Sequence, residues 1–175
     1  MLRLTAHPSA PCDDLIVSAL AERGAGGAIA LRWRVEGAVD TIVWPPAASG
    51  RADELWRTTC FEAFVAPVNA SGYVELNRSP SGAWAAYQFD DYRAGMREYS
   101  VIGTAFSAAR GNTHAEYGFA TRLPGMADDW QVGLAAVIER NDGRLHYFAL
   151  EHVGGRPDFH DRAGFALTLA EGEGA

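Results

Sequence analysis

The sequence predicts an all-β protein with little helix, folded as an antiparallel two-sheet β-sandwich of about ten strands. Short runs that alternate between apolar and polar residues recur along most of the chain. The 19 glycines and eight prolines are spread without a period, as expected where many short strands are joined by turns. The Asn141-Asp142-Gly143 segment is a strong hairpin signal, because Asp-Gly accepts the positive φ angles of a tight turn.

The alternation places the expected strands at residues 2–6, 13–22, 28–35, 41–44, 59–66, 72–78, 83–89, 101–109, 113–121, 130–139, 145–150 and 165–169. Residues 13–22 fit a helical stripe as well as a strand face, and the β-rich surroundings favour the strand. One helical turn is expected at 53–55 and a short helix within 90–97. With no internal repeat or boundary, we expect one domain at 1–170 and a frayed tail at 171–175.

The composition is that of an ordinary globular protein, with 48% hydrophobic and 21% charged residues. A net charge of −7 and the absence of lysine argue against nucleic-acid binding, which depends on clustered basic side chains. No apolar run approaches the roughly 20 residues of a membrane span, and no secretory signal is recognisable. Cys12 and Cys60 lack metal-ligand spacing and are expected to be free thiols. We therefore expect a cytoplasmic protein that does not associate with membranes.

The stretch from Asp53 to Arg93 is unusual, because acids and amides stand where a strand is normally apolar. Three of the expected strands lie in it, at 59–66, 72–78 and 83–89. The apolar faces expected to point into one core are Phe61, Ala63 and Val65, then Val74 and Leu76, then Ala85, Tyr87 and Phe89.

Pointing these faces into one core implies a register, since a slip of one residue would turn a strand's apolar set toward water. On the other face, that register places Glu75 directly across from Glu62. In the second hairpin it places Asn77 across from Trp84. Opposed carboxylates repel at a Cβ separation of about 5 Å, so this pair needs a shared proton, a cation or a ligand.

The carboxylate pair has three interpretations. Glycosidases use paired carboxyl groups about 5 to 9.5 Å apart, so the pair is compatible with a hydrolase. It also fits a structural ion cluster neutralised by Arg57 or Arg78, or a polar ligand bound without chemistry. Trp56 and Trp84 are candidate aromatic platforms, because a flat ring beside amides and carboxylates suits a sugar. Either ring also fits a role as core or sheet cover.

A polar segment before the last expected strand contains His152, Asp158 and His160. The two histidines are separated by a Gly-Gly-Arg-Pro loop, which is no recognised metal-ligand spacing, so no metal is expected. A loop stiffened by side-chain hydrogen bonds is the favoured interpretation. The chain has no nucleophile elbow, phosphate-binding glycine loop or dinucleotide fingerprint, and no cofactor is expected.

Three runs, LWRTTCFEAFVAP, YVELNRSPSGAWAAYQFDDYR and FALEHVGGRPDFHDRAGFAL, resemble the bacterial DOMON-like domains, which are related to family-nine carbohydrate-binding modules. The resemblance covers nearly the whole chain and implies a jelly-roll-like sandwich whose wider relatives bind sugars or haem. The positions that match the shared core are Trp56, Glu62, Glu75, Asn77 and Trp84. Haem-binding relatives use Met and His ligands, but Met96, Met126 and the five histidines form no matching pattern.

The resulting prediction is a non-catalytic domain that binds a carbohydrate or sugar-like metabolite, either a small molecule or an oligosaccharide. The predicted ligand-binding residues are Trp56, Arg57, Glu62, Glu75, Asn77, Trp84, His152, Asp158 and His160. A hydrolase using the carboxylate pair and a protein-interaction module whose aromatic face is an interface stay open as alternatives. The sequence does not determine the oligomeric state.

Overall fold

The computed structural model describes residues 1–170, and the predicted tail at 171–175 lies outside them. The strands are β1 (Leu2–Ala6), β2 (Leu15–Gly24), β3 (Ala28–Gly37), β4 (Gly50–Arg51), β5 (Cys60–Pro67), β6 (Tyr73–Arg78), β7 (Ala83–Phe89), β8 (Arg97–Glu98), β9 (Ile102–Arg110), β10 (His114–Arg122), β11 (Trp130–Glu139), β12 (Leu145–Ala149) and β13 (Leu167–Leu169). Short 3₁₀ turns are η1 (Ala25–Gly27), η2 (Val39–Thr41), η3 (Leu55–Arg57) and η4 (Arg162–Gly164). The fold is all-β with little helix, as predicted, and no helix in this part of the chain has the length and apolar character to cross a membrane.

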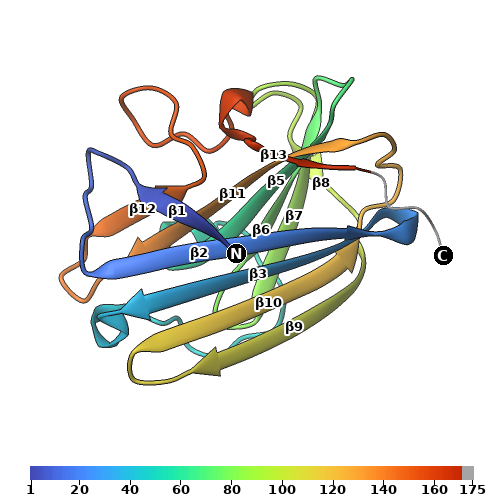
Figure 1. Ribbon diagram of the computed structural model, residues 1–175. Helices are drawn as coiled ribbons and strands as arrows, with labels where there is room; N and C mark the ends of the chain where they lie inside the picture. The colour runs from blue at the N-terminus through green and yellow to red at the C-terminus, as the bar shows by residue number, and fades with distance from the viewer. Residues whose placement is uncertain (171–175) are drawn as a thin grey trace.

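The predicted two-sheet antiparallel sandwich is wrong, because the strands form one continuous mixed sheet that curls into a half-barrel (Figure 1). The strand order is β4-β7-β6-β5-β11-β12-β1-β2-β3-β10-β9, with β13 beside β11 and β8 beside β7. Within residues 1–170 the sheet has 13 strands instead of about ten. It is mixed because β4 runs parallel to β7.

Strand β1 joins what would otherwise be two sheets. Toward its start it pairs with β2, where Leu4 lies opposite Val17. At its end it pairs with β12, where Thr5 lies opposite Ala149. Alternation within a run predicts which residues face inward, but it carries no information about which distant strand lies alongside. The continuity of the sheet was therefore outside the reach of the sequence pattern.

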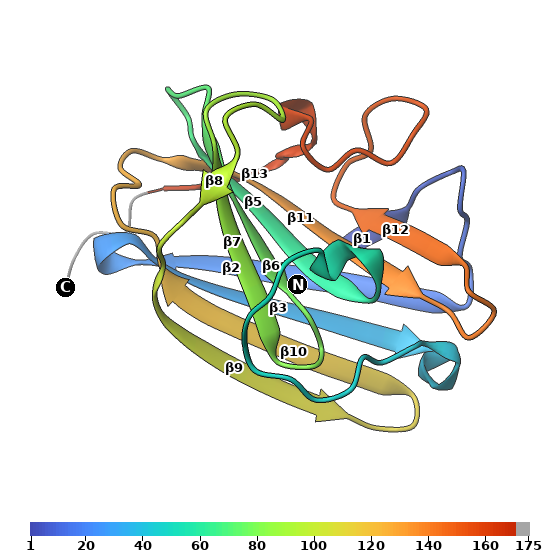
Figure 2. The same ribbon diagram turned by 180° about the vertical axis from the view of Figure 1, so that it is seen from behind.

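The curl brings the inner faces of the two halves of the sheet together around one apolar core (Figures 1 and 2). Trp33 on β3 stacks against Phe61 on β5 with ring centroids 5.5 Å apart. The ring of Phe61 also lies 5.0 Å from that of Tyr117 on β10. Aromatic pairs at these distances add to the gain from burial, which is roughly 25 cal/mol per Å² of apolar surface. These contacts between the halves stabilise the curl.

Most of the strands lie where alternation predicts them. The ambiguous segment at 13–22 is a strand, and β2 pairs with β3 along its whole length. The predicted Asp-Gly hairpin is confirmed: Gly143 has φ 81°, and its N–H donates to the carbonyl of Arg140 at 2.8 Å. The positive φ explains why a glycine stands at this position.

Two local predictions are wrong. The strand expected at 41–44 is replaced by η2 and a single bridge between Ile42 and Arg140. The two prolines that follow Trp44 carry no N–H, so they cannot extend a ladder there. The short helix expected within 90–97 is instead a turn leading to β8, and Arg93 in it has φ 51°. A left-handed residue of this kind is incompatible with a right-handed helix.

The register between β5 and β6 is displaced by two residues from the predicted one. Glu62 lies opposite Asn77, and Glu75 lies opposite Phe64. The two carboxylates are therefore diagonal neighbours instead of a directly opposed pair. A two-residue displacement keeps every side chain on its own face, so the alternation cannot reveal it.

The register between β6 and β7 is displaced by one residue, which turns β7 over. Glu75 lies opposite Tyr87 instead of Ala86. Tyr87 and Phe89 therefore leave the main core, whereas Trp84 packs against it. Both faces of β7 carry apolar residues because both are covered, so the alternation cannot choose between them.

The outer faces of β5, β6 and β7 carry a second apolar cluster. Its buried members are Phe64, Ala66, Tyr73, Ala85, Tyr87, Phe89 and Phe165. The rings of Tyr73 and Phe89 stack with centroids 4.8 Å apart, and Phe159 packs at the edge of the cluster. This cluster forms one side of the hollow in which the candidate site lies.

Candidate ligand-binding site

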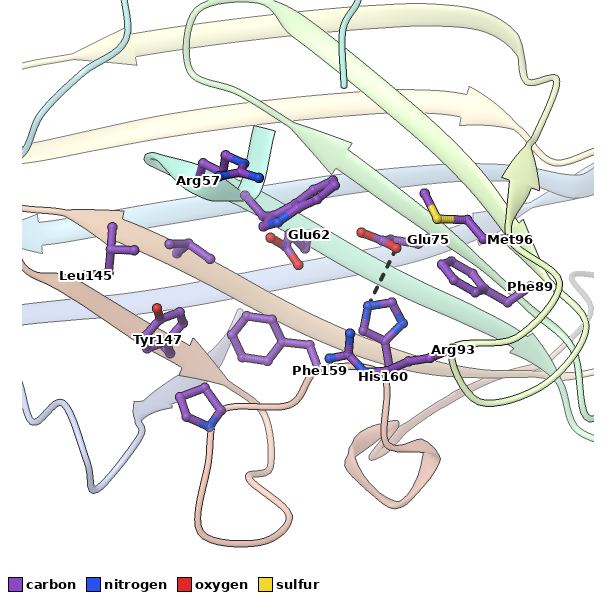
Figure 3. Close-up of a pocket in the computed structure, with 13 residues that line it drawn as sticks. Arg57, Glu62, Glu75, Phe89, Arg93, Met96, Leu145, Tyr147, Phe159 and His160 are labelled. Carbon is purple, nitrogen blue, oxygen red and sulfur yellow. Dashed lines mark ion pairs between the residues drawn. The ribbon is translucent and has the colours of Figure 1, made fainter. Parts of the chain in front are cut away.

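A pocket of about 660 Å³ opens on the outer face of β5, β6, β11 and β12 (Figure 3). It is lined by Trp56, Arg57, Glu62, Glu75, Phe89, Arg93, Met96, Val137, Leu145, Tyr147, Pro157, Phe159 and His160, and we call it the acidic pocket. Strand residues form its floor, and the segments around η3, after β7 and after β12 form its rim. Its size is within the range of small-molecule sites, roughly 300 to 1,000 Å³.

Two carboxyl groups lie on the floor of the acidic pocket and are almost fully buried, with Glu62 3% and Glu75 4% exposed. The Nδ2 amide of Asn77 donates to Glu75 Oε1 at 2.6 Å. Glu62 Oε1 has no hydrogen-bond partner within residues 1–170. A buried polar atom without a partner is costly, so this oxygen is a natural contact point for a ligand.

The two carboxyl groups differ in their electrostatic environment. Burial and the charge of Glu75 raise the pKa of Glu62 well above its usual value, and Arg93 opposes this only in part. Burial also raises the pKa of Glu75, but the Asn77 hydrogen bond and Arg93 lower it. The pair therefore holds a proton on Glu62 to higher pH, while Glu75 is the one that ionises first.

His160 lies over Glu75 at the rim, as the dashed contact in Figure 3 shows. Its Nε2 is 3.8 Å from Glu75 Oε2, and its Nδ1 is 2.7 Å from the hydroxyl of Tyr73. Burial, assisted by the charge of Arg93, lowers the pKa of His160 to about 4, although Asp158 opposes the shift. The imidazole is therefore neutral at physiological pH and does not neutralise Glu75.

The loop after β7 and the loop before η4 are tied together beside the pocket. Arg93 donates to Asp158 at 2.9 Å, and its backbone N–H donates to the Tyr73 hydroxyl at 3.2 Å. The backbone N–H of His160 donates to the same Asp158 carboxylate at 3.1 Å. This network positions His160 without placing Asp158 on the pocket wall.

Trp56 supplies the most exposed aromatic surface of the pocket, with 37% of the residue accessible. It lies on η3, just after Glu54, whose φ of 58° turns the chain at this point. The rings of Trp56 and Tyr87 meet in a T-shaped arrangement with a centroid distance of 6.4 Å. Exposed aromatic faces of this kind are the usual platforms for sugar rings and apolar ligands.

The structure brings together five of the predicted ligand residues on the pocket wall: Trp56, Arg57, Glu62, Glu75 and His160. Asn77 is fully buried beneath them, where it orients Glu75. Asp158 holds the loop as described above.

Two predicted ligand residues lie away from the acidic pocket. Trp84 lies on the opposite face of the sheet, against the core, because of the one-residue displacement of β7. His152 is not part of the wall: its Nε2 contacts the carbonyl of Thr5 at 2.8 Å, and its ring meets His7 edge-on at 4.8 Å.

Neither arginine of the ion-cluster interpretation, Arg57 or Arg78, pairs with the floor carboxyl groups. Arg57 pairs with Glu54 at 2.8 Å instead of with either floor carboxylate. The guanidinium of Arg78 lies over the ring of Phe106 at 4.1 Å, within the core side of the sheet. Burial lowers the pKa of Arg78 to about 10, which is consistent with a cation held away from water.

The sequence pattern missed eight wall residues: Phe89, Arg93, Met96, Val137, Leu145, Tyr147, Pro157 and Phe159. Leu145 and Tyr147 alternate along β12, which was a signal that they share a face. It did not show that this face adjoins β5, since that depends on the pairing of β11 with both strands. Within residues 1–170, no group of three or more His, Cys, Asp and Glu side chains gathers in a way that would hold a metal ion.

No protein-family model matches this chain, and no curated protein matches it either. Among solved structures, the fold is similar to the crystal structure of a "putative carbohydrate-binding protein" from Bacteroides uniformis. The match has a TM-score of 0.68 and 19% sequence identity, and it covers 97% of this chain and 84% of the other. The predicted relationship to DOMON-like domains stays a prediction. What the two proteins share at this identity is the fold.

Proposed function

We propose that this protein binds a carbohydrate or sugar-like metabolite in the acidic pocket without catalysing a reaction. The observation that carries the proposal is that the exposed ring of Trp56 and the buried carboxyl groups of Glu62 and Glu75 line the same pocket. A sugar ring presents C–H faces that stack on an indole and hydroxyl groups that both donate and accept hydrogen bonds. The protonated carboxyl group of Glu62 supplies a donor, and the carboxyl oxygens of Glu75 supply acceptors.

Two further points support this ligand class. The fold resembles that of a protein to which carbohydrate binding is ascribed, and the three sequence runs described above resemble DOMON-like domains. The rings of Tyr147 and Phe159 add apolar wall to the same pocket. Binding sites for small ligands combine mostly apolar walls with a few polar groups that fix orientation.

Calorimetric titration against a panel of neutral, acidic and amino sugars and their oligomers tests the proposal. We expect at least one member to bind, and Trp56→Ala to weaken that binding by about tenfold or more, as for an aromatic contact at the centre of a site. Phe106→Ala is the matched control, because Phe106 is 36% exposed but lies on β9 in the other half of the sheet. A folded protein that binds nothing in the panel would contradict the proposal.

Hydrolysis of a glycosidic bond is the second candidate, favoured by the unequal carboxyl pair. A pair in which Glu62 keeps its proton to higher pH than Glu75 matches the acid and base roles of a glycosidase. Incubation with chromogenic aryl glycosides would then release the chromophore, and Glu75→Gln would abolish the release. Binding without turnover across the same sugars favours the non-catalytic function.

A further inference from the structure

The described residues do not fully neutralise the carboxyl groups of Glu62 and Glu75 on the floor of the acidic pocket. Glu75 receives its short hydrogen bond from the neutral amide of Asn77, and the nearby imidazole of His160 is uncharged at physiological pH. Glu62 is 3% exposed, lines the pocket, and has an Oε1 without a hydrogen-bond partner within residues 1–170. A buried acid of this kind is favourable only when protonated or when a cation reaches it.

The arginines at the rim do not supply that cation. Arg57 pairs with Glu54 at 2.8 Å, and Arg93 pairs with Asp158 at 2.9 Å. Their side chains are 67% and 51% exposed, so both charges are largely solvated as well as paired. Arg93 lowers the pKa of each floor carboxyl by its charge, but no hydrogen bond joins it to either one in the described structure.

The walls favour a cation with an organic body over a bare metal ion. Phe89, Tyr147, Phe159 and Trp56 surround the two carboxyl groups with aromatic rings. Aromatic faces attract organic cations, and a pocket of about 660 Å³ is far larger than an ion requires. Carboxylate oxygens beside aromatic rings suit an ammonium group attached to a ring-shaped ligand.

We propose that the acidic pocket selects an amino sugar, whose ammonium group contacts Glu62 and Glu75 while its ring lies against Trp56. This inference rests on the proposed sugar-binding function and narrows it to one chemical class. A free ammonium donates three charge-assisted hydrogen bonds, enough to reach both carboxyl groups. An N-acetylated sugar has no charge at that position and only one N–H to donate.

Binding of an ammonium group should release the proton of Glu62. The titratable and charged groups near Glu62 are Cys60 on β5, Glu75 on β6, Tyr147 on β12, Arg57 on η3, Arg93 in the loop after β7 and His160 before η4. Of these, Glu75 disfavours ionisation of Glu62, as burial does, so Glu62 holds a proton in the empty pocket. An arriving ammonium stabilises the carboxylate, and the proton of Glu62 passes to the buffer while the ammonium keeps all of its own. A neutral sugar causes no such release.

Titration calorimetry of the unmodified protein at about pH 6 tests this, since an amino sugar is fully protonated there. The probes are glucosamine, glucose and N-acetylglucosamine, together with short oligomers of glucosamine and N-acetylglucosamine. We expect the ammonium form to bind at least about tenfold more tightly than the other two. We also expect its apparent enthalpy to differ between two buffers of unlike ionisation enthalpy, which reports a released proton, with no difference for a neutral sugar that binds.

Glu62→Gln should remove the buffer dependence and most of the preference for the ammonium form. Glu22→Gln is the matched control, because Glu22 is exposed on β2. Tighter or equal binding of the neutral sugars, without proton release, overturns this inference and leaves the proposed function standing. If none of the sugars binds, both the amino-sugar inference and the proposed function are contradicted. If the Glu62 variant fails to fold, the two-buffer comparison on the unmodified protein still decides the matter.

Discussion

The hydroxyl of Tyr73 and Nδ1 of His160 lie 2.7 Å apart, and this contact decides which nitrogen of the imidazole faces Glu75. The same hydroxyl accepts the backbone N–H of Arg93 at 3.2 Å, so its own hydrogen is free to be donated to Nδ1. In the neutral ring, Nε2 then carries the hydrogen and directs it toward Glu75, 3.8 Å away. A residue on β6 thus orients a loop residue over the acidic pocket.

His160 should make stability fall in mild acid. Its pKa is about 4 in the folded protein and 6.5 as the reference value, so the unfolded chain takes up the proton first as pH falls. Stability should therefore decline between pH 6.5 and pH 4, by on the order of 3 kcal/mol from this group. Urea unfolding at pH 7 and near pH 4 should show a smaller decline for His160→Gln than for wild type. Identical declines would refute the assignment, and His114→Gln on β10 serves as the control.

Glu62→Gln should stabilise the folded protein at neutral pH. The folded pKa of Glu62 is raised, so the native state keeps a proton that the unfolded chain loses above the usual value of 4.5, and stability falls as pH rises through that range. A neutral glutamine cannot ionise, so the variant should be more stable than wild type above this pH range. Denaturant unfolding should show the gain near pH 7 and little of it near pH 4, whereas Glu22→Gln should show none.

The two tryptophans of the central region should respond in opposite ways. Trp84 packs against the main core, so Trp84→Ala should cost about 2 to 3 kcal/mol of stability and leave sugar binding unchanged. Trp56 is exposed on the pocket wall, so Trp56→Ala should cost less than about 1 kcal/mol and weaken binding. Chemical unfolding and titration of both variants check this. If the folded Trp84→Ala variant lost sugar binding, Trp84 would have to face the ligand, as the register predicted from the sequence places it.

Arg162 should hold the turn between β5 and β6. Its guanidinium donates to Gln131 Oε1 at 3.0 Å and to the carbonyl of Pro67 at 2.6 Å, and it also contacts the carbonyl of Ala70. Removing a cation that satisfies several buried or half-buried acceptors costs about 2 kcal/mol. We expect that loss for Arg162→Ala, with faster amide hydrogen exchange at residues 68–71.

The control for this experiment is Arg144→Ala. The Arg144 side chain is 79% exposed and makes one ion pair at 3.6 Å, so its loss should change stability by less than about 0.5 kcal/mol. Equal effects of the two substitutions would show that the Arg162 contacts contribute nothing specific to the turn.

Local alternation was sufficient for much of the fold and for part of the site. It located most strands, as in β3, where Ile29, Leu31 and Trp33 are buried between more exposed neighbours. It also placed Glu62 and Glu75 on one face, and they share that face in the structure although the register differs. The two side chains stay on the same face because β6 is displaced by two residues, which is the side-chain period of a strand.

What the sequence determined by itself was the all-β class, the positions of most of the strands and the acids that form the pocket floor. The tertiary structure decided that β1 joins both halves into one sheet, that Trp84 faces the core, and that Tyr147 and Phe159 stand beside the acids. The physical reason is that periodicity records only whether a face is buried. Where both faces of a strand are covered, as in β7, or where the partner is distant in the chain, long-range packing makes the choice.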